Sequence, residues 1–245
     1  MLNLIQKKII QNIVNIFETG QIHGDYQAVT VLKGDPGRLT YGRSQASLAS
    51  GNLTRLLKAY CDAKGSYADQ VELWLPALEA KDPALDTNRA IRLLLKQAGA
   101  DPVMKKVQDE FFDRMFWLPA SKTAAELFIH TPLGVAIIYD SFVHGSFQVI
   151  RRRNDRQLGP SLAVGEEAWI RNYIGLRREW LTTHANEVLR RTVYRMDAFH
   201  ALMEAANWAL DLPLTVRDVY IEASDVQDVS QTPPAPLRVL EFANP

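Results

Sequence analysis

The sequence predicts a mainly α fold (α+β) with a small antiparallel sheet beside a large helical body. Three observations lead to this prediction. The first 18 residues have helical periodicity, the next segment combines short β-branched runs with turn residues, and the chain after about residue 47 has helical periodicity almost throughout. A helix, a small sheet and a helical body in this order are compatible with two lobes and a cleft between them.

The first helix is expected over residues 2–18. Its apolar residues recur at helical spacing and form one stripe with polar residues opposite, namely Leu2, Ile5, Ile9, Ile13, Ile16 and Phe17. Thr19-Gly20 stops this helix, so we expect Glu18 at its C-terminal end.

The segment after this helix predicts two short strands joined by a turn. Residues 26–33 are rich in β-branched and apolar side chains, and 38–42 resemble a return strand. Between them, Gly34-Asp35-Pro36-Gly37 has the composition of a tight turn. Asp35 is therefore expected in the turn of a small sheet.

Most of the remaining chain is expected to be helical, at 52–63, 68–81, 87–98, 102–117, 122–130, 132–149, 162–183 and 185–210. Asp101-Pro102 is a helix start signal, and Pro132 separates two apolar helices. The arginine-rich stretch 151–156 is interpreted as a solvated loop rather than a phosphate contact. We expect one catalytic domain over 1–224 and a Pro-rich tail or linker over 225–245.

Composition and charge restrict the classes of function. The 245 residues include 28 Lys and Arg against 28 Asp and Glu, which argues against a nucleic-acid partner. No apolar stretch approaches the roughly 18 residues of a membrane span, so no membrane partner is expected. The single Cys61 excludes an intrachain disulfide. The five histidines lack metal-ligand spacing, so no metal is expected, and no cofactor is expected either.

Two carboxyl groups are a candidate acid and base. Glu18 follows the apolar Ile16-Phe17 pair, an environment that favours the protonated form needed by a general acid. Asp35 lies in a polar turn, where a carboxyl stays ionised, as a general base must. Two such groups across a cleft suit glycoside hydrolysis. The alternative, a solvated Glu and a turn-forming Asp, is the commoner role of such residues, so the pair alone does not decide between them.

A resemblance to a known family favours the catalytic interpretation. The run Glu18, Tyr26 and Asp35-Pro36-Gly37-Arg38-Leu39-Thr40-Tyr41-Gly42 resembles the signature of the chitosanases of glycoside hydrolase family 46, in the lysozyme-like superfamily. Further matches in register are Trp74 to Leu78, Tyr139-Asp140, His144-Gly145, Arg177-Arg178, Arg195 to Asp197 and Leu210 to Leu214. Their order and spacing agree from about residue 1 to 220.

The resemblance implies a two-lobed, lysozyme-like fold and a role for each matching residue. Glu18 matches the general acid, Asp35 the general base, and Thr40 a threonine that helps to hold the attacking water. Three further residues match a buried network beneath the acid, namely Asp140, Arg177 and Arg195. Predicted substrate-binding residues are Tyr26, Arg38, Gly42, Asn52 and His144. For His144, a core position with its hydrogen bonds satisfied is an equally good interpretation.

The sequence also departs from the family at positions where a chitosan cleft carries carboxylates. Val31 and Leu32, followed by Lys33, occupy the strand, and Asn52 occupies the later position. Aliphatic and amide groups cannot pair with a polycation, which favours peptidoglycan over chitosan as the substrate.

We therefore expect an endo-acting, inverting glycoside hydrolase that cleaves β-1,4 bonds of an amino-sugar polymer. Peptidoglycan is the favoured polymer and chitosan the alternative. Two other classes stay open: a non-catalytic glycan-binding protein on the same scaffold, and a transglycosylase, which would not need Asp35. The N-terminus does not resemble a signal peptide. Synthesis in the cytoplasm and signal-independent delivery to an extracellular or periplasmic glycan would suit an antibacterial effector or a phage lysin, with an immunity or delivery protein as a partner.

Overall fold

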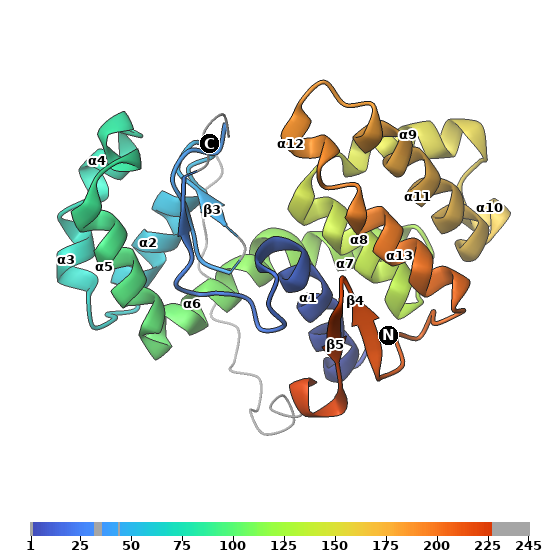
Figure 1. Ribbon diagram of the computed structural model, residues 1–245, viewed down its shortest axis with the longest axis horizontal. Coiled ribbons are helices and arrows are strands. Elements are labelled where there is room, and N and C mark those ends of the chain that lie inside the picture. Colours follow the sequence, from blue (N-terminus) through green and yellow to red (C-terminus); the bar gives the residue numbers. More distant parts are fainter. Residues whose placement is uncertain (1, 32–35, 44, 227–245) are drawn as a thin grey trace.

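The computed structural model describes residues 2–31, 36–43 and 45–226. The chain forms two lobes, each with its own hydrophobic core, joined by a long helical segment (Figure 1). The first segment, α1 (Leu4–Thr19), packs in the larger lobe, the chain then builds the smaller lobe, and it returns to complete the larger one. This arrangement confirms the predicted mainly α fold with small antiparallel sheets.

The smaller lobe contains a three-stranded antiparallel sheet and short helices. The sheet order is β1 (Val29–Thr30), β2 (Thr40–Tyr41) and β3 (Ala46–Ser47). Its helices are α2 (Asn52–Asp62), α3 (Ala68–Glu72), α4 (Leu75–Glu79), the 3-10 turn η1 (Pro83–Asp86), α5 (Arg89–Ala100) and α6 (Pro102–Phe112). The sheet lies on the side of this lobe that faces the larger lobe (Figure 1).

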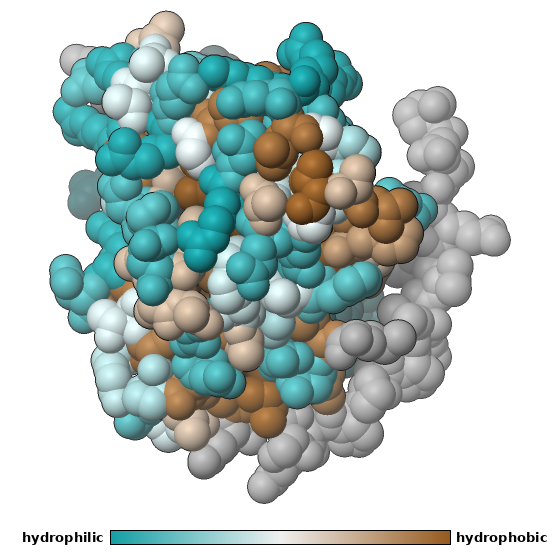
Figure 2. Space-filling view, turned by 90° about the vertical axis from the view of Figure 1, so that its right-hand side faces the viewer, coloured by the Kyte–Doolittle hydropathy of each residue, from teal (hydrophilic) through white to brown (hydrophobic). Residues whose placement is uncertain are grey.

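The larger lobe is built from helices around α1 and α8. Besides α1 it contains α7 (Leu118–Glu126), α8 (Pro132–His144), α9 (Phe147–Gln157), α10 (Ser161–Val164), α11 (Glu166–Thr182), α12 (Glu187–Arg190) and α13 (Tyr194–Glu204). An antiparallel hairpin, β4 (Leu214–Val216) and β5 (Val219–Ile221), packs on the same core. The end of this lobe that points away from the smaller lobe is mostly hydrophilic, with apolar side chains interspersed (Figure 2).

Helix α1 differs from the predicted amphipathic helix in one respect. A capping box of Asn3 and Gln6 begins it, and Gly20, with φ +74°, ends it, as expected. The structure, however, buries Gln11, Asn12 and Asn15 as well as the apolar stripe. Only the second half of the helix, from Ile9 to Phe17, is covered on all sides, because it runs through the interior of the larger lobe, whereas Ile5 of the predicted stripe is exposed.

Several expected element boundaries are wrong. Residues 151–156 are not a loop but part of α9, in which Arg151 pairs with Asp155 one turn later. The helix predicted over 132–149 breaks at Gly145, whose φ of +93° does not fit a helix. Residues 102–126 run on through the π-helical turn η2 (Asp113–Trp117) with no loop between the two predicted helices.

The expected absence of a membrane partner and the predicted domain boundary both stay predictions. Among the described residues, none belongs to a helix that is long and apolar enough to cross a membrane. The tail predicted over 225–245 lies outside the described residues from 227 onward, so the domain boundary at 224 stays a prediction.

Candidate active site

Glu18 occupies the last turn of α1, as the sequence predicts. Its Oε1 accepts a hydrogen bond from Nη2 of Arg195 at 2.5 Å, and its side chain is 17% exposed. The Arg195 guanidinium of the network that the resemblance implies therefore lies directly beside the carboxyl, in addition to the apolar Ile16-Phe17 pair. This hydrogen bond occupies Oε1, so the protonated form of the carboxyl would carry its proton on Oε2.

A buried ion network lies behind this pair. Asp140 of α8 accepts from Nη1 of Arg195 at 2.6 Å through Oδ1 and from Nη1 of Arg177 at 3.1 Å through Oδ2. All three side chains are buried. Burial by itself raises the pKa of Asp140, but the guanidinium groups of Arg195 and Arg177 outweigh it and hold this pKa below its usual value. The carboxylate is therefore ionised and offsets part of the positive charge beside Glu18.

His144 extends the network at the end of α8. Nη2 of Arg177 lies 3.1 Å from its Nδ1, and a guanidinium can only donate, so Nδ1 accepts and Nε2 carries the ring proton. Burial, followed by the charge of Arg195, lowers the pKa of His144 to about 3. The imidazole is thus neutral at physiological pH. Among the described residues, no group of three or more His, Cys, Asp or Glu side chains is arranged to hold a metal ion.

The main chain before Glu18 is held separately. Tyr194 donates its hydroxyl hydrogen to the carbonyl of Phe17 at 2.9 Å, and its ring packs against the ring of Phe17. The guanidinium of Arg217, in the turn between β4 and β5, lies 3.9 Å from the centre of the Tyr194 ring. Carbonyls in the last turn of a helix lack intrahelical partners, so this hydrogen bond also caps α1.

Thr40 lies on β2, directly opposite Thr30 of β1. The two hydroxyl oxygens are 2.6 Å apart, and Oε1 of Gln45 lies 2.6 Å from Thr30 Oγ1 and 2.7 Å from Thr40 Oγ1. The predicted water-holding threonine is therefore part of a compact polar cluster on the sheet.

Other predicted residues have contacts within the protein. Tyr26 donates to Asp109, and Arg38 donates to Asp86 and to two main-chain carbonyls of the smaller lobe. Gly42 has φ +80°, and a Cβ there would lie 2.3 Å from the Gln108 side chain. These contacts explain the residues structurally, and their predicted roles in substrate binding stay predictions.

The remaining predicted positions are described only in part. Asp35, Leu32 and Lys33 lie outside the described residues. Val31 packs against the core of the smaller lobe, and Asn52 begins α2, where its main-chain N–H donates to Ser50.

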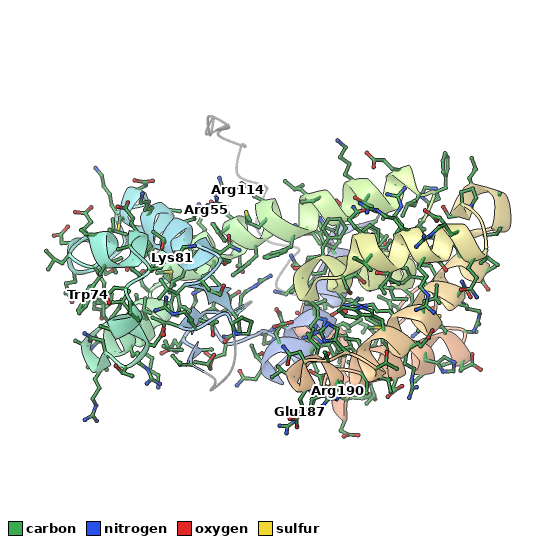
Figure 3. All side chains as sticks on the ribbon, turned by 90° about the horizontal axis from the view of Figure 1, so that it is seen from above. Arg55, Trp74, Lys81, Arg114, Glu187 and Arg190 are labelled. Carbon is green, nitrogen blue, oxygen red and sulfur yellow. The ribbon has the colours of Figure 1, made fainter. Side chains whose placement is uncertain are left out.

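Figures 1 and 3 show α12, with the labelled Glu187 and Arg190, at the edge of the larger lobe next to the smaller lobe.

Sequence reasoning missed Tyr194, Thr30 and Gln45. Tyr194 precedes Arg195, so the resemblance at 195–197 could have drawn attention to it. Thr30 and Gln45 become partners of Thr40 only through the strand register and the conformation of the loop after β2. No spacing in the sequence indicates that contact.

The fold and the network define a two-lobed, mainly α protein in which a buried ion network backs a carboxyl group at the end of α1. The chain belongs to glycosyl hydrolase family 46, whose profile matches residues 12–214. It is 27% identical over 234 residues to the chitosanase of Bacillus subtilis (strain 168), covering 88% of this chain and 83% of that protein. The prediction of a glycoside hydrolase is confirmed by this family membership.

Solved chitosanase structures share the fold. A mutant chitosanase of Bacillus subtilis MY002, complexed with 6 GlcN, superimposes with a TM-score of 0.79 at 24% identity, covering 89% of this chain and 96% of that one. The family 46 chitosanase of Gynuella sunshinyii, complexed with chitotetraose, gives a TM-score of 0.79 at 22% identity, covering 90% and 98% of the two chains.

Proposed function

We propose that this protein cleaves β-1,4 glycosidic bonds within chitosan by an inverting mechanism, with Glu18 as the general acid and Asp35 as the general base. The observation that carries the proposal is the link from Glu18 through Arg195 to the buried Asp140. Burying charged groups costs free energy even when they are paired. A solvated glutamate at a helix end would give no reason to bury two guanidinium groups behind it.

The network supports proton donation in a defined direction. Arg195 can only donate, so in the protonated acid the proton resides on Oε2 while Oε1 keeps its hydrogen bond. The glycosidic oxygen takes that proton as its bond to the anomeric carbon breaks. Asp35 takes a proton from the water that forms the new bond, and the two carboxyls end with exchanged protonation states.

The relatives favour chitosan over the peptidoglycan that the sequence alone favoured. The curated relative is named a chitosanase, and two of the solved structures are complexes with 6 GlcN and with chitotetraose. In this proposal, the aliphatic Val31 and the amide Asn52 occupy positions that form no ion pair with the amino groups of chitosan. Delivery without a signal peptide, an effector or lysin role, and an immunity or delivery partner all stay predictions.

A comparison of substrates with acid and base variants tests the proposal. The purified protein is incubated with chitosan and with peptidoglycan, and the products are identified by mass spectrometry. We expect glucosamine oligomers from chitosan and a loss of at least about 100-fold in rate for Glu18→Gln and for Asp35→Asn, at an unchanged melting temperature. Products from peptidoglycan alone would contradict the substrate, and more than a tenth of the activity in either variant would contradict the site.

A further inference from the structure

The cluster of Thr30, Thr40 and Gln45 contains three oxygens at mutual hydrogen-bond distance. The two threonine hydroxyls and Oε1 of Gln45 are separated by 2.6, 2.6 and 2.7 Å. The main-chain carbonyl of Thr30 is a further acceptor, 3.3 Å from Thr40 Oγ1. Every neighbour of the Thr40 hydroxyl in this cluster can therefore accept its hydrogen.

The orientation of the Gln45 amide is fixed by its second contact. Its Nε2 donates to the carbonyl of Gly42 at 2.8 Å, so Oε1 must face the threonines. The main-chain N–H of Gln45 donates to the same carbonyl at 3.0 Å, and its φ of +51° is the left-handed conformation that this tight loop requires. Two hydrogen bonds to one carbonyl hold the acceptor in place.

A count of hydrogens favours Thr40 as an acceptor toward a group outside the cluster. A carbonyl oxygen can only accept, and each hydroxyl has one hydrogen and two lone pairs. Whether the Thr40 hydrogen goes to Gln45, to the Thr30 hydroxyl or to the Thr30 carbonyl, it is used within the cluster. Thr40 keeps at least one lone pair outside the cluster, since Thr30 can occupy only one of the two.

We infer that Gln45, supported by Thr30, is a positioning residue that makes Thr40 accept a hydrogen bond from the attacking water instead of donating one. The inference rests on the proposed function and on the water-holding role that the family resemblance implies for Thr40. A water that donates one hydrogen to Thr40 and the other to the general base keeps both lone pairs on the side away from these two partners, where one of them can attack the anomeric carbon. A Thr40 that donated to the water would engage one of the two lone pairs of the water and draw electron density from its oxygen, which would weaken the attack.

Gln45→Met tests this inference because it removes the carbonyl acceptor at nearly constant side-chain volume. We expect kcat to fall about 10-fold, the equivalent of one hydrogen bond, with KM and the melting temperature close to those of the wild type. Gln157→Met is the matched control, because Gln157 is exposed at the end of α9 and the same chemical change there should leave kcat unaltered.

The decisive comparison repeats Gln45→Met in the Thr40→Val background. If Gln45 acts through Thr40, its substitution costs less than two-fold in kcat once the hydroxyl is gone. An equal loss in both backgrounds, or no loss in the wild-type background, would overturn the inference. If Gln45→Met does not fold, Thr30→Val is compared in the same two backgrounds with the same criterion.

Glu18→Gln separates this inference from the proposed function. An inactive Glu18→Gln together with an equal effect of Gln45→Met in both backgrounds would overturn the role of Gln45 and leave the acid in place. Full activity of Glu18→Gln would overturn the proposed site, and the positioning role of Gln45 with it.

Discussion

Tyr194 donates its hydroxyl hydrogen to the main-chain carbonyl of Phe17 at 2.9 Å. Phe17 immediately precedes Glu18, and Tyr194 immediately precedes Arg195, which binds the Glu18 carboxyl. Two adjacent residues at the start of α13 thus hold the main chain and the side chain at the end of α1. The ring of Phe17 contacts both residues, with the Tyr194 ring centre 6.1 Å and the Arg195 guanidinium 5.4 Å from its own centre.

Tyr194→Phe should loosen this end of α1 while the ring contacts remain. Loss of the hydrogen bond should lower the free energy of unfolding by about 1 kcal/mol, which is a melting temperature lower by roughly 2–4 °C. We also expect a lower kcat, because Glu18 is less well oriented. Thermal unfolding and steady-state kinetics measure both, with Tyr220→Phe, exposed on β5, as the control. A variant with wild-type stability and kcat would show that this hydrogen bond positions nothing.

Asp140→Ala should be strongly destabilising. It leaves the buried Arg177 and Arg195 without their shared partner, at a cost of roughly 3–5 kcal/mol in the free energy of unfolding. Activity should fall with it. The control is Asp197→Ala, which breaks the half-exposed pair with Arg178 and should cost less than about 1 kcal/mol.

A double-mutant cycle between Asp140→Ala and Arg195→Ala measures the coupling in denaturant unfolding. We expect the two effects to be clearly non-additive, because the residues share a buried ion pair. Additive effects would show that Asp140 does not hold Arg195 in place behind Glu18.

His144 should make the protein less stable in acid. In the unfolded chain its imidazole takes a proton below about pH 6.5, whereas the folded protein holds its pKa at about 3. The unfolded state binds more protons between these values, so the free energy of unfolding falls as the pH falls, by roughly 1.6 kcal/mol between pH 6.5 and 5.

His144→Asn isolates this contribution, because an amide oxygen can replace Nδ1 as the acceptor for Arg177 but takes no proton. Its stability should change less between pH 6.5 and 5 than that of the wild type, measured by denaturant unfolding at each pH. The lowered pKa of Asp140 adds little between pH 6.5 and 5, because an aspartate in the unfolded chain takes up protons mainly below about pH 4. Identical pH profiles would contradict a neutral, buried His144.

Much of the fold could be predicted because its signals are local. The spacing of Ile9, Ile13 and Ile16 and the stop at Gly20 place α1, and with it Glu18, within a residue or two. The strands β3, β4 and β5 were missed because two or three residues carry no usable periodicity. The prediction of a loop at 151–156 is wrong because α9 buries only a few side chains, so its charged residues show little apolar periodicity.

The candidate site depends on contacts that periodicity cannot predict. Asp140, Arg177 and Arg195 come from α8, α11 and α13, and only the family resemblance placed them together before the structure did. Gln45 and Thr30 reach Thr40 through strand pairing and a left-handed loop residue, which no local pattern announces.

The central claim is inverting hydrolysis by Glu18 and Asp35, and the stereochemistry of the first product tests it most directly. Glu18 lies at the end of α1, and Asp35 is expected on the turn of the sheet in the other lobe, so we predict carboxyls roughly 6.5–9.5 Å apart with a water between them. Proton NMR of a glucosamine hexamer during the first minutes of hydrolysis identifies the nascent anomer. Inverting hydrolysis by Glu18 and Asp35 yields the α-anomer first from the β-linked substrate, whereas a β-anomer as the first product would contradict inversion.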